Sequence, residues 1–131
     1  MIINKNRILS SENKKPILYD VYYNETGNPQ PVVIFCHGYK GFKDWGAWHL
    51  VAEAFAESGF CFVKFNFSHN GGTMENPIDF PDLEAFAENN FSFELDDLDR
   101  VLNEIEKGND NFPKKISTIS LIGHSRGGGI V

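Results

Sequence analysis

The chain has 131 residues, 41% of them hydrophobic and 14% aromatic, which suits one globular domain with its own core. Its 12 basic and 18 acidic side chains give a net charge of −6, and no stretch concentrates Lys and Arg, which argues against a nucleic-acid partner. Neither the apolar core of a secretory leader nor a run of about 18 apolar residues is present, so no membrane span is predicted. Cys36 and Cys61 lie in apolar runs and are expected to be buried free thiols of a cytoplasmic protein.

The first half of the chain predicts an edge hairpin followed by a buried strand and a helix. Residues 2–9 and 17–23 are strand-like, and a polar segment with one proline connects them. The apolar run at 32–36 is typical of a parallel strand covered on both faces. A helix should then follow, with Asp44 as its N-cap, apolar residues at helical spacing, and Gly59 as its stop.

The second half continues the alternation of strands and helices. We expect a strand at 60–67, a long polar connection containing one short helical turn, a helix at 93–107 and a strand at 114–123. Leu95, Leu98, Val101 and Ile105 form the apolar stripe predicted for the second helix, and the acidic "ELDDLD" is interpreted as its solvated face. This order predicts an α/β fold with a mostly parallel sheet, flanking helices and an N-terminal antiparallel hairpin.

The segment "LIGHSRGGG" has the GxSxG form of a nucleophile elbow, from Gly123 through His124, Ser125 and Arg126 to Gly127. Strand and helix cross so closely at such a turn that the flanking positions need glycine. A glycine-rich turn without catalytic function is the simplest alternative. A dinucleotide-binding loop is a weaker one, because its glycines should follow the first strand of the unit rather than the last.

A second motif, His37-Gly38, follows the predicted strand at 32–36. Acyl transfer needs a nucleophile at the tip of a sharp turn and backbone N–H groups directed at the developing oxyanion. Ser125 is therefore the candidate nucleophile, and the N–H groups of Arg126 and Tyr39 are the candidate oxyanion donors. His37 is expected to maintain the shape of its loop through hydrogen bonds.

Together, "VVIFCHGYKGFKDW", "FNFSHNG" and "LIGHSRGGG" resemble the N-terminal half of an α/β-hydrolase of the esterase, dienelactone-hydrolase or serine-peptidase-like kind. The resemblance covers essentially residues 1–131, which would form a single partial domain. Ser68-His69-Asn70-Gly71 departs from the Arg-Gly-His-Gly wording found in many members. In this family the acid and the base follow the serine in the chain, which implies that both lie beyond Val131 and that the chain as given is an inactive fragment, truncated just after the elbow.

Several other residues are weaker candidates for catalysis or binding. His69, oriented by Asp79 or Asp82, is a possible substitute base, whereas His124 adjoins Ser125 and should point away from its hydroxyl. The four histidines lack metal-binding spacing, so neither a metal nor another cofactor is expected. Three aromatic residues could wall an acyl pocket, although core packing is the more ordinary role for them: Phe42, Trp45 and Trp48.

Two functions remain open from the sequence. The first is a serine hydrolase that cleaves a small-molecule carboxylic ester, thioester or amide through an acyl-enzyme on Ser125. The second is a non-catalytic remnant or interaction module that keeps the α/β sheet and binds an acyl compound or a protein. In either case an exposed edge of the sheet could favour self-association.

Overall fold

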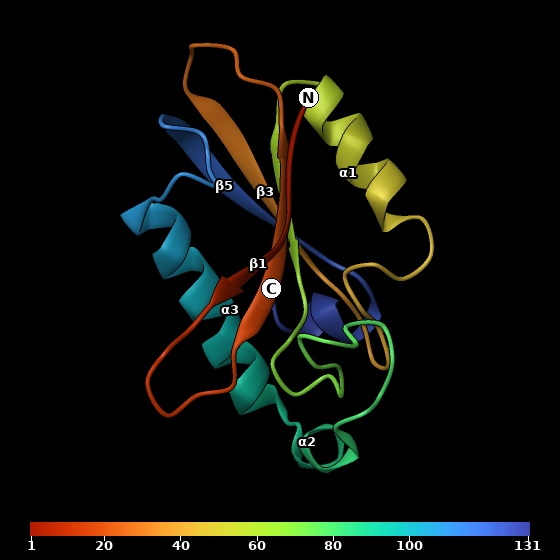
Figure 1. Cartoon of the computed structure of the whole chain (residues 1–131). Coiled ribbons are helices and arrows are strands. Elements are labelled where there is room, and N and C mark those ends of the chain that lie inside the picture. The colour runs from red at the N-terminus through yellow and green to blue at the C-terminus, as the bar shows by residue number, and fades with distance from the viewer.

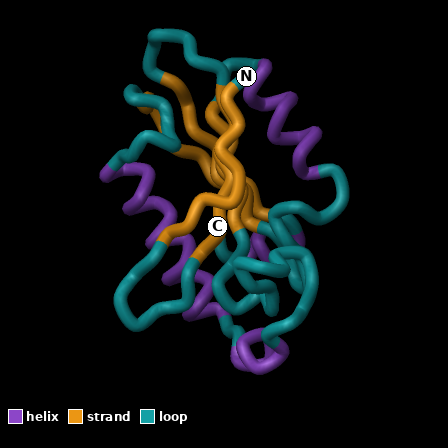
Figure 2. Tube along the Cα trace, viewed as in Figure 1, coloured by secondary structure: helices purple, strands orange, loops and turns teal.

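The computed structural model describes residues 1–131 and places five strands in one sheet, in the order β1-β2-β4-β3-β5 (Figures 1 and 2). The strands are β1 (Ile2–Leu9), β2 (Ile17–Tyr23), β3 (Gln30–Cys36), β4 (Cys61–Phe65) and β5 (Ile116–Gly123). The helices are α1 (Trp48–Glu57), α2 (Leu83–Glu88) and α3 (Phe91–Lys107), and a 3₁₀ turn, η1 (Ser125–Gly129), follows β5. No helix combines the length and the apolar character needed to cross a bilayer.

The pairing of the strands confirms the predicted α/β fold class. β1 pairs antiparallel with β2, as the hairpin prediction requires, and β2 pairs antiparallel with β4. β3 pairs in parallel with β4 on one side and with β5 on the other. Parallel strands need a crossover connection, which α1 supplies between β3 and β4 and α3 supplies between β4 and β5.

Apolar residues of the strands fill both faces of the sheet. On one face α1 buries Ala52 and Ala56 against Val33, Phe35 and Phe62. On the other face α3 packs against alternate strand residues in a larger cluster that includes Val32, Ile34, Cys36, Val63, Phe65, Leu98, Val101 and Ile105. Figure 1 shows α1 and α3 on opposite sides of the sheet. β3 is buried along almost its whole length, as expected of a strand covered on both faces.

Two expectations about the helices are wrong. Asp44 is not the N-cap of α1, which begins at Trp48 after Ala47, because the Asp44 carboxylate binds two lysine ammonium groups instead. In α3, Leu95 is 52% exposed, whereas the acidic residues Glu94 and Asp97 are buried. These two carboxylates have cationic or hydroxyl partners, which offset the cost of burying their charge.

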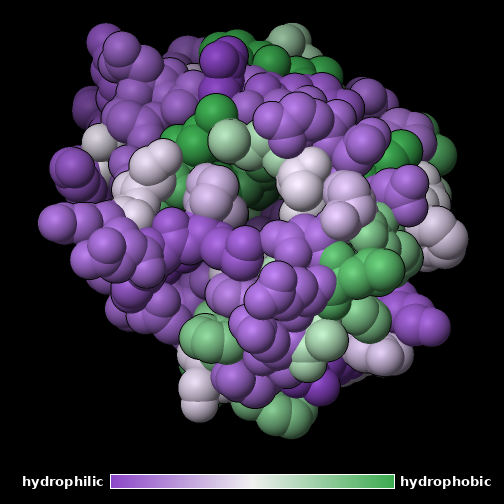
Figure 3. Space-filling view, turned by 60° about the horizontal axis from the view of Figure 1, so that its bottom comes forward, coloured by the Kyte–Doolittle hydropathy of each residue, from purple (hydrophilic) through white to green (hydrophobic).

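The carboxyl ends of β3, β4 and β5 meet at one end of the sheet, which is the lower end in Figure 1. The loops that follow these strands and the short helix α2 cover this end. Seen from this side, the surface is largely hydrophilic and is hollowed near its centre (Figure 3). Ligands of open α/β sheets bind outside the carboxyl ends of the strands, so a functional site is expected at this end.

Candidate active site

A sharp turn links β5 to η1 and presents Ser125 to solvent. Ser125 has φ of 57°, in the left-handed region that a residue with a side chain rarely adopts. A Cβ added to Gly123 would overlap the backbone of Gly127, and one added to Gly127 would overlap the carbonyl of Cys36. Glycine is therefore required at both positions, because the turn packs directly on itself and on the end of β3. The arrangement has the strained backbone and the close crossing of a nucleophile elbow.

The loop after β3 lies against this turn. A Cβ added to Gly38 would lie 3.0 Å from Cβ of Ser125 and 3.1 Å from the carbonyl oxygen of His124. The Gly41 N–H donates to the Gly38 carbonyl at 3.0 Å, which closes a tight turn around Tyr39. The two sequence motifs, far apart along the chain, are thus brought together at the carboxyl ends of β3 and β5.

His37 links this loop to the loop after β4. It is 3% exposed, and its Nε2 accepts the Phe67 N–H at 3.1 Å. Because Nε2 is an acceptor, Nδ1 carries the proton and donates to the Gly38 carbonyl at 2.9 Å. Burial lowers the pKa of His37 to about 4, and the bond to Gly38 only partly offsets this shift. His37 is therefore neutral near pH 7, and its two hydrogen bonds hold the loops after β3 and β4 in a fixed position relative to one another.

Arg126, the residue after Ser125, is bound to the first turn of α3. Its Nε donates to Glu94 Oε1 at 2.6 Å, and its guanidinium lies 4.0 Å from the centre of the Phe91 ring. Glu94 is 3% exposed. Glu94 was expected on a solvated face. Its placement four residues before Leu98, on the apolar stripe of the helix, is the signal in the sequence that indicates burial.

His69 makes its hydrogen bond to Ser68 and not to Ser125. Its Nδ1 is 2.8 Å from the Ser68 hydroxyl, and its ring stacks on Phe93 with 4.2 Å between the ring centres. Asp82 caps α2 and pairs with Lys15, and Asp79 accepts from the Phe80 N–H, so the expected orientation of His69 by either carboxylate is wrong. Burial also lowers the pKa of His69 from its ordinary value.

Ser68 is part of a buried polar group that joins the loop after β4 to α3. Its N–H and its hydroxyl donate to Asp97, each at 2.8 Å to Oδ2. Arg100 approaches the same carboxylate at 3.4 Å and also donates to the Lys15 carbonyl. Burial raises the pKa of Asp97 to about 6, against the opposing effects of the Ser68 hydrogen bonds and the Arg100 charge.

The residues adjoining the turn differ in their burial. His124 is exposed and its ring meets the edge of Trp48, with 5.2 Å between the ring centres. Phe42 is 2% exposed and packs on Phe80, whereas Trp45 is 62% exposed. Cys36 and Cys61 are buried free thiols, as predicted, and burial raises the pKa of each to about 12.

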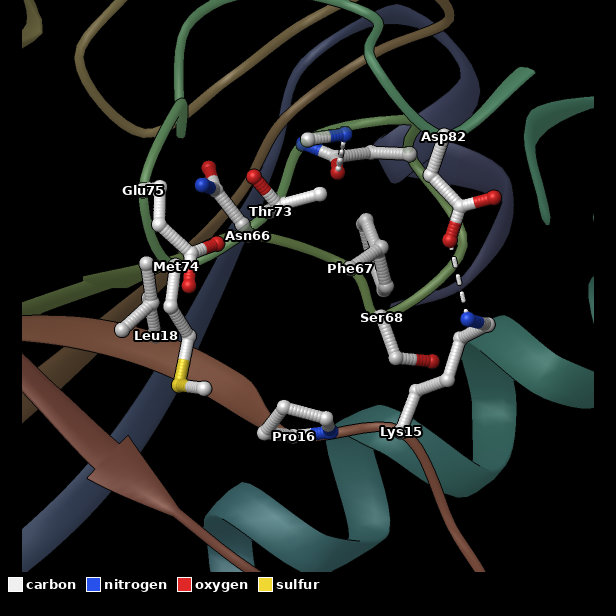
Figure 4. Close-up of a pocket in the computed structure, with 12 residues that line it drawn as sticks. Lys15, Pro16, Leu18, Asn66, Phe67, Ser68, Thr73, Met74, Glu75 and Asp82 are labelled. Carbon is white, nitrogen blue, oxygen red and sulfur yellow. Dashed lines mark hydrogen bonds and ion pairs between the residues drawn. The ribbon is translucent and has the colours of Figure 1, made fainter.

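A separate cavity of about 150 Å³ opens between β2, the end of β4 and the loop after it (Figure 4). The ion pair between Lys15 and Asp82, 2.9 Å long, crosses one side of it, and Met74 and Leu18 line the opposite side. Ser125 does not line this cavity. The cavity is therefore a neighbour of the candidate active site and not its nucleophile pocket.

Comparison with known proteins assigns the family. A model of the alpha/beta hydrolase fold matches residues 31–131, and the chain belongs to this family. The matched region contains both motifs and all of the parallel part of the sheet except Gln30, the first residue of β3. No match to the chain was found among curated proteins.

Solved structures of the family share the fold at low sequence identity. A carboxyl esterase from Bacillus coagulans superposes with a TM-score of 0.69 at 16% identity, covering 99% of this chain and 38% of its own. Mouse alpha/beta hydrolase domain-containing protein 10 superposes with a TM-score of 0.65 at 21% sequence identity. The match covers 95% of this chain and 41% of the mouse protein. Est1E from Butyrivibrio proteoclasticus, solved with ferulic acid, superposes with a TM-score of 0.65 at 19% sequence identity. The match covers 93% of this chain and 43% of Est1E. The chain thus spans about two fifths of the length of these structures.

Proposed function

We propose that the complete protein containing this chain is a serine hydrolase that cleaves a carboxylic ester, thioester or amide of a small molecule. Ser125 attacks the substrate carbonyl carbon, and the leaving group departs from an acyl-enzyme that water then hydrolyses. The principal support is the left-handed backbone of Ser125 on a turn that admits only glycine at 123 and 127. Such strain persists where function requires a particular side-chain direction.

The oxyanion of the tetrahedral intermediate is assigned to two backbone donors. The Arg126 N–H follows the nucleophile, and the Tyr39 N–H follows Gly38, which lies beside Ser125. Both donors belong to the main chain, so they are preorganised and need no reorientation during the reaction. The side chains of these residues are free for other roles, as the pairing of Arg126 with Glu94 illustrates.

The acid and the base are assigned to the part of the protein after Val131. A serine hydroxyl becomes an effective nucleophile only when a base accepts its proton, and in this family the two partners follow the serine in the chain. Within residues 1–131, His69 makes its hydrogen bond to Ser68 rather than to Ser125. The serine, both oxyanion donors and the loops that hold them come from residues 1–131.

A fluorophosphonate probe tests this proposal directly. In the complete protein, Ser125 should be labelled stoichiometrically and labelling should vanish in Ser125→Ala. Ser120→Ala, an exposed serine on β5, is the matched control and should label normally. The proposal would be contradicted, and the binding module favoured, if the folded complete protein did not label. Labelling that persists unchanged in the Ser125→Ala variant would have the same meaning. Residues 1–131 alone should not label, because the base is absent.

A further inference from the structure

Four buried or half-buried charged side chains form a cluster under the loop that follows β3. We infer that this charge cluster, Asp20, Lys43, Asp44 and Lys64, fixes the loop that carries the Tyr39 N–H, and that Lys64 is a positioning residue for the oxyanion donor. The inference rests on the proposed function, since it assigns the cluster a role in that site. The sequence pattern suggested a helix cap for Asp44 and did not single out the other three residues.

Asp20 and Lys64 face one another across the antiparallel pair of β2 and β4. The Lys64 ammonium lies 3.0 Å from Asp20 Oδ2, 3.0 Å from Asp44 Oδ1 and 2.9 Å from the Lys43 carbonyl oxygen. Lys43 Nζ lies 3.0 Å from Asp20 Oδ1 and 2.7 Å from Asp44 Oδ2. Each carboxylate therefore bridges both ammonium groups, and the exposed Lys5 ammonium adds a longer contact to Asp44 Oδ1 at 3.8 Å.

The cluster is almost completely withdrawn from water. Asp20, Lys43 and Lys64 have fully buried side chains, and that of Asp44 is 21% exposed. Burial alone would raise the pKa of Asp44, but its bonds to Lys43 and Lys64 lower it to about 2. Burial likewise opposes the charge of Lys64, and the two carboxylates outweigh it and raise its pKa. Asp44 and Lys64 are thus charged near pH 7.

Lys43 is where the cluster meets the loop. Its main-chain N–H donates to Asn66 Oδ1 at 2.7 Å and its carbonyl accepts from Lys64, while its own ammonium reaches Asn6 Oδ1 at 2.6 Å. The Lys43 backbone is consequently tied to β4 and to the loop after it, and its ammonium group is tied to β1 and β2.

Tyr39 lies between two such fixed points. On one side His37 is bound to Phe67, and on the other side the turn closed by Gly38 and Gly41 leads through buried Phe42 to Lys43. The Tyr39 side chain itself is 64% exposed, so it does not hold the backbone. Movement of Lys43 would therefore be passed to the Tyr39 N–H through only three intervening residues of chain.

A purely structural role explains this cluster less well. Buried ion pairs recover little or none of their desolvation cost, and apolar residues of similar volume often give equal or greater stability. What the pairs provide is a single geometry, because each ammonium must meet three oxygens at once. An oxyanion donor must be held in one such position, because a displacement of about 1 Å can lower the reaction rate a hundredfold.

The test compares Lys64→Met in the complete protein with Val63→Ala, which alters the adjacent buried residue on the opposite face of β4. Lys64→Met should lower kcat about ten- to a hundredfold with KM within about twofold, because the oxyanion exists only in the transition state. The affinity of a boronic acid inhibitor should fall in parallel. Val63→Ala should reduce stability while leaving kcat and the affinity for the boronic acid inhibitor near their wild-type values. An equal kcat loss in the two variants would overturn the inference.

Hydrogen exchange supplies a readout that does not need activity. Amides at 38–45 should exchange faster in Lys64→Met and in the milder Asp44→Asn, which keeps three of the four charges and is the variant to use if the first fails to fold. Val63→Ala should leave their protection unchanged relative to the rest of the sheet. Unchanged protection in Asp44→Asn, or faster exchange without loss of kcat, would overturn the inference. Failure of the proposed function would instead appear as full activity in Ser125→Ala.

Discussion

Glu94, in the first turn of α3, accepts a hydrogen bond from the Arg126 guanidinium at 2.6 Å, and Arg126 directly follows the strained Ser125. The crossover helix is in this way attached to the turn that carries the proposed nucleophile. The Phe91 ring lies against the same guanidinium, so the Arg126 side chain is held from two directions. This contact places the stability of the turn partly under the control of α3.

Glu94→Gln should weaken this attachment. The substitution removes the ionic part of a buried charged hydrogen bond, and we expect a loss of about 2 kcal/mol in the free energy of unfolding. Urea denaturation followed by circular dichroism measures the loss. Glu106→Gln, an exposed residue on the same helix, is the control and should change stability by less than about 0.5 kcal/mol. Equal stability of the two variants would show that the Arg126 contact contributes nothing.

Gly127→Ala should destabilise the protein by roughly 2 to 3 kcal/mol, because the added methyl group would overlap the carbonyl of Cys36 and force β3 and the turn apart. Gly128→Ala is the matched control, since its nearest contact would be an ordinary 3.7 Å from Gly123. Thermal unfolding of the two variants checks the contrast. Similar melting temperatures would mean that the turn can relax without cost.

His37 should remain neutral throughout the physiological range. Its folded pKa of about 4 lies below the ordinary value of 6.5, because burial disfavours the charged imidazole. Stability from this group is therefore complete above pH 6.5 and is lost as the pH falls toward 4. Nitrogen chemical shifts of the imidazole should report an Nδ1–H tautomer that does not titrate between pH 8 and pH 5. A midpoint near pH 6.5 would contradict the buried hydrogen bond to Phe67.

The contribution of Asp97 to stability should change with pH in the opposite direction to that of His37, over an overlapping pH range. Its folded pKa of about 6 lies above the ordinary value of 3.8, so the folded state binds the proton more tightly than the unfolded chain does. Its contribution is greatest below pH 3.8 and is lost as the pH rises through 6. At about 1.4 kcal/mol per pKa unit, the loss is on the order of 3 kcal/mol.

The measurement is the difference in unfolding free energy between wild type and Asp97→Asn, taken at several pH values. Both proteins contain His37, so its opposing contribution cancels. The stability of wild type relative to the variant should fall between pH 4 and pH 6. A difference that is flat across this range would mean that the Ser68 hydrogen bonds and Arg100 hold the Asp97 pKa near its ordinary value.

Patterns of apolar residues predicted most of the fold. The continuous run at 32–36 indicated a strand buried on both faces, and its pairing with β4 and β5 bears this out. The glycines around Ser125 indicated a sharp turn, and the overlap of any side chain at 123 or 127 explains them. These features depend on local sequence, so they can be read without knowledge of distant contacts.

Buried charges could not be predicted in the same way. Asp44 stands where a helix cap is expected, and only the position of Lys64 across from Asp20 explains why it pairs with lysines instead. Glu94 and Asp97 looked like solvent-exposed acids, because their partners, Arg126 and Ser68, lie far away in the chain. Such pairings are decided by the register of the sheet and by the docking of α3, which local patterns do not specify.

The placement of β3 between β4 and β5 also has a consequence for the order of folding. The hairpin of β1 and β2 and its pairing with β4 use only the first half of the chain, whereas β5 must find β3 after the whole of α3 has intervened. Closing so long a loop is slow, because its entropy is lost before the contacts form. Gly38 and Ser125 therefore become neighbours only when β5 pairs with β3, so the elbow and the loop beside it depend on a contact between distant parts of the chain.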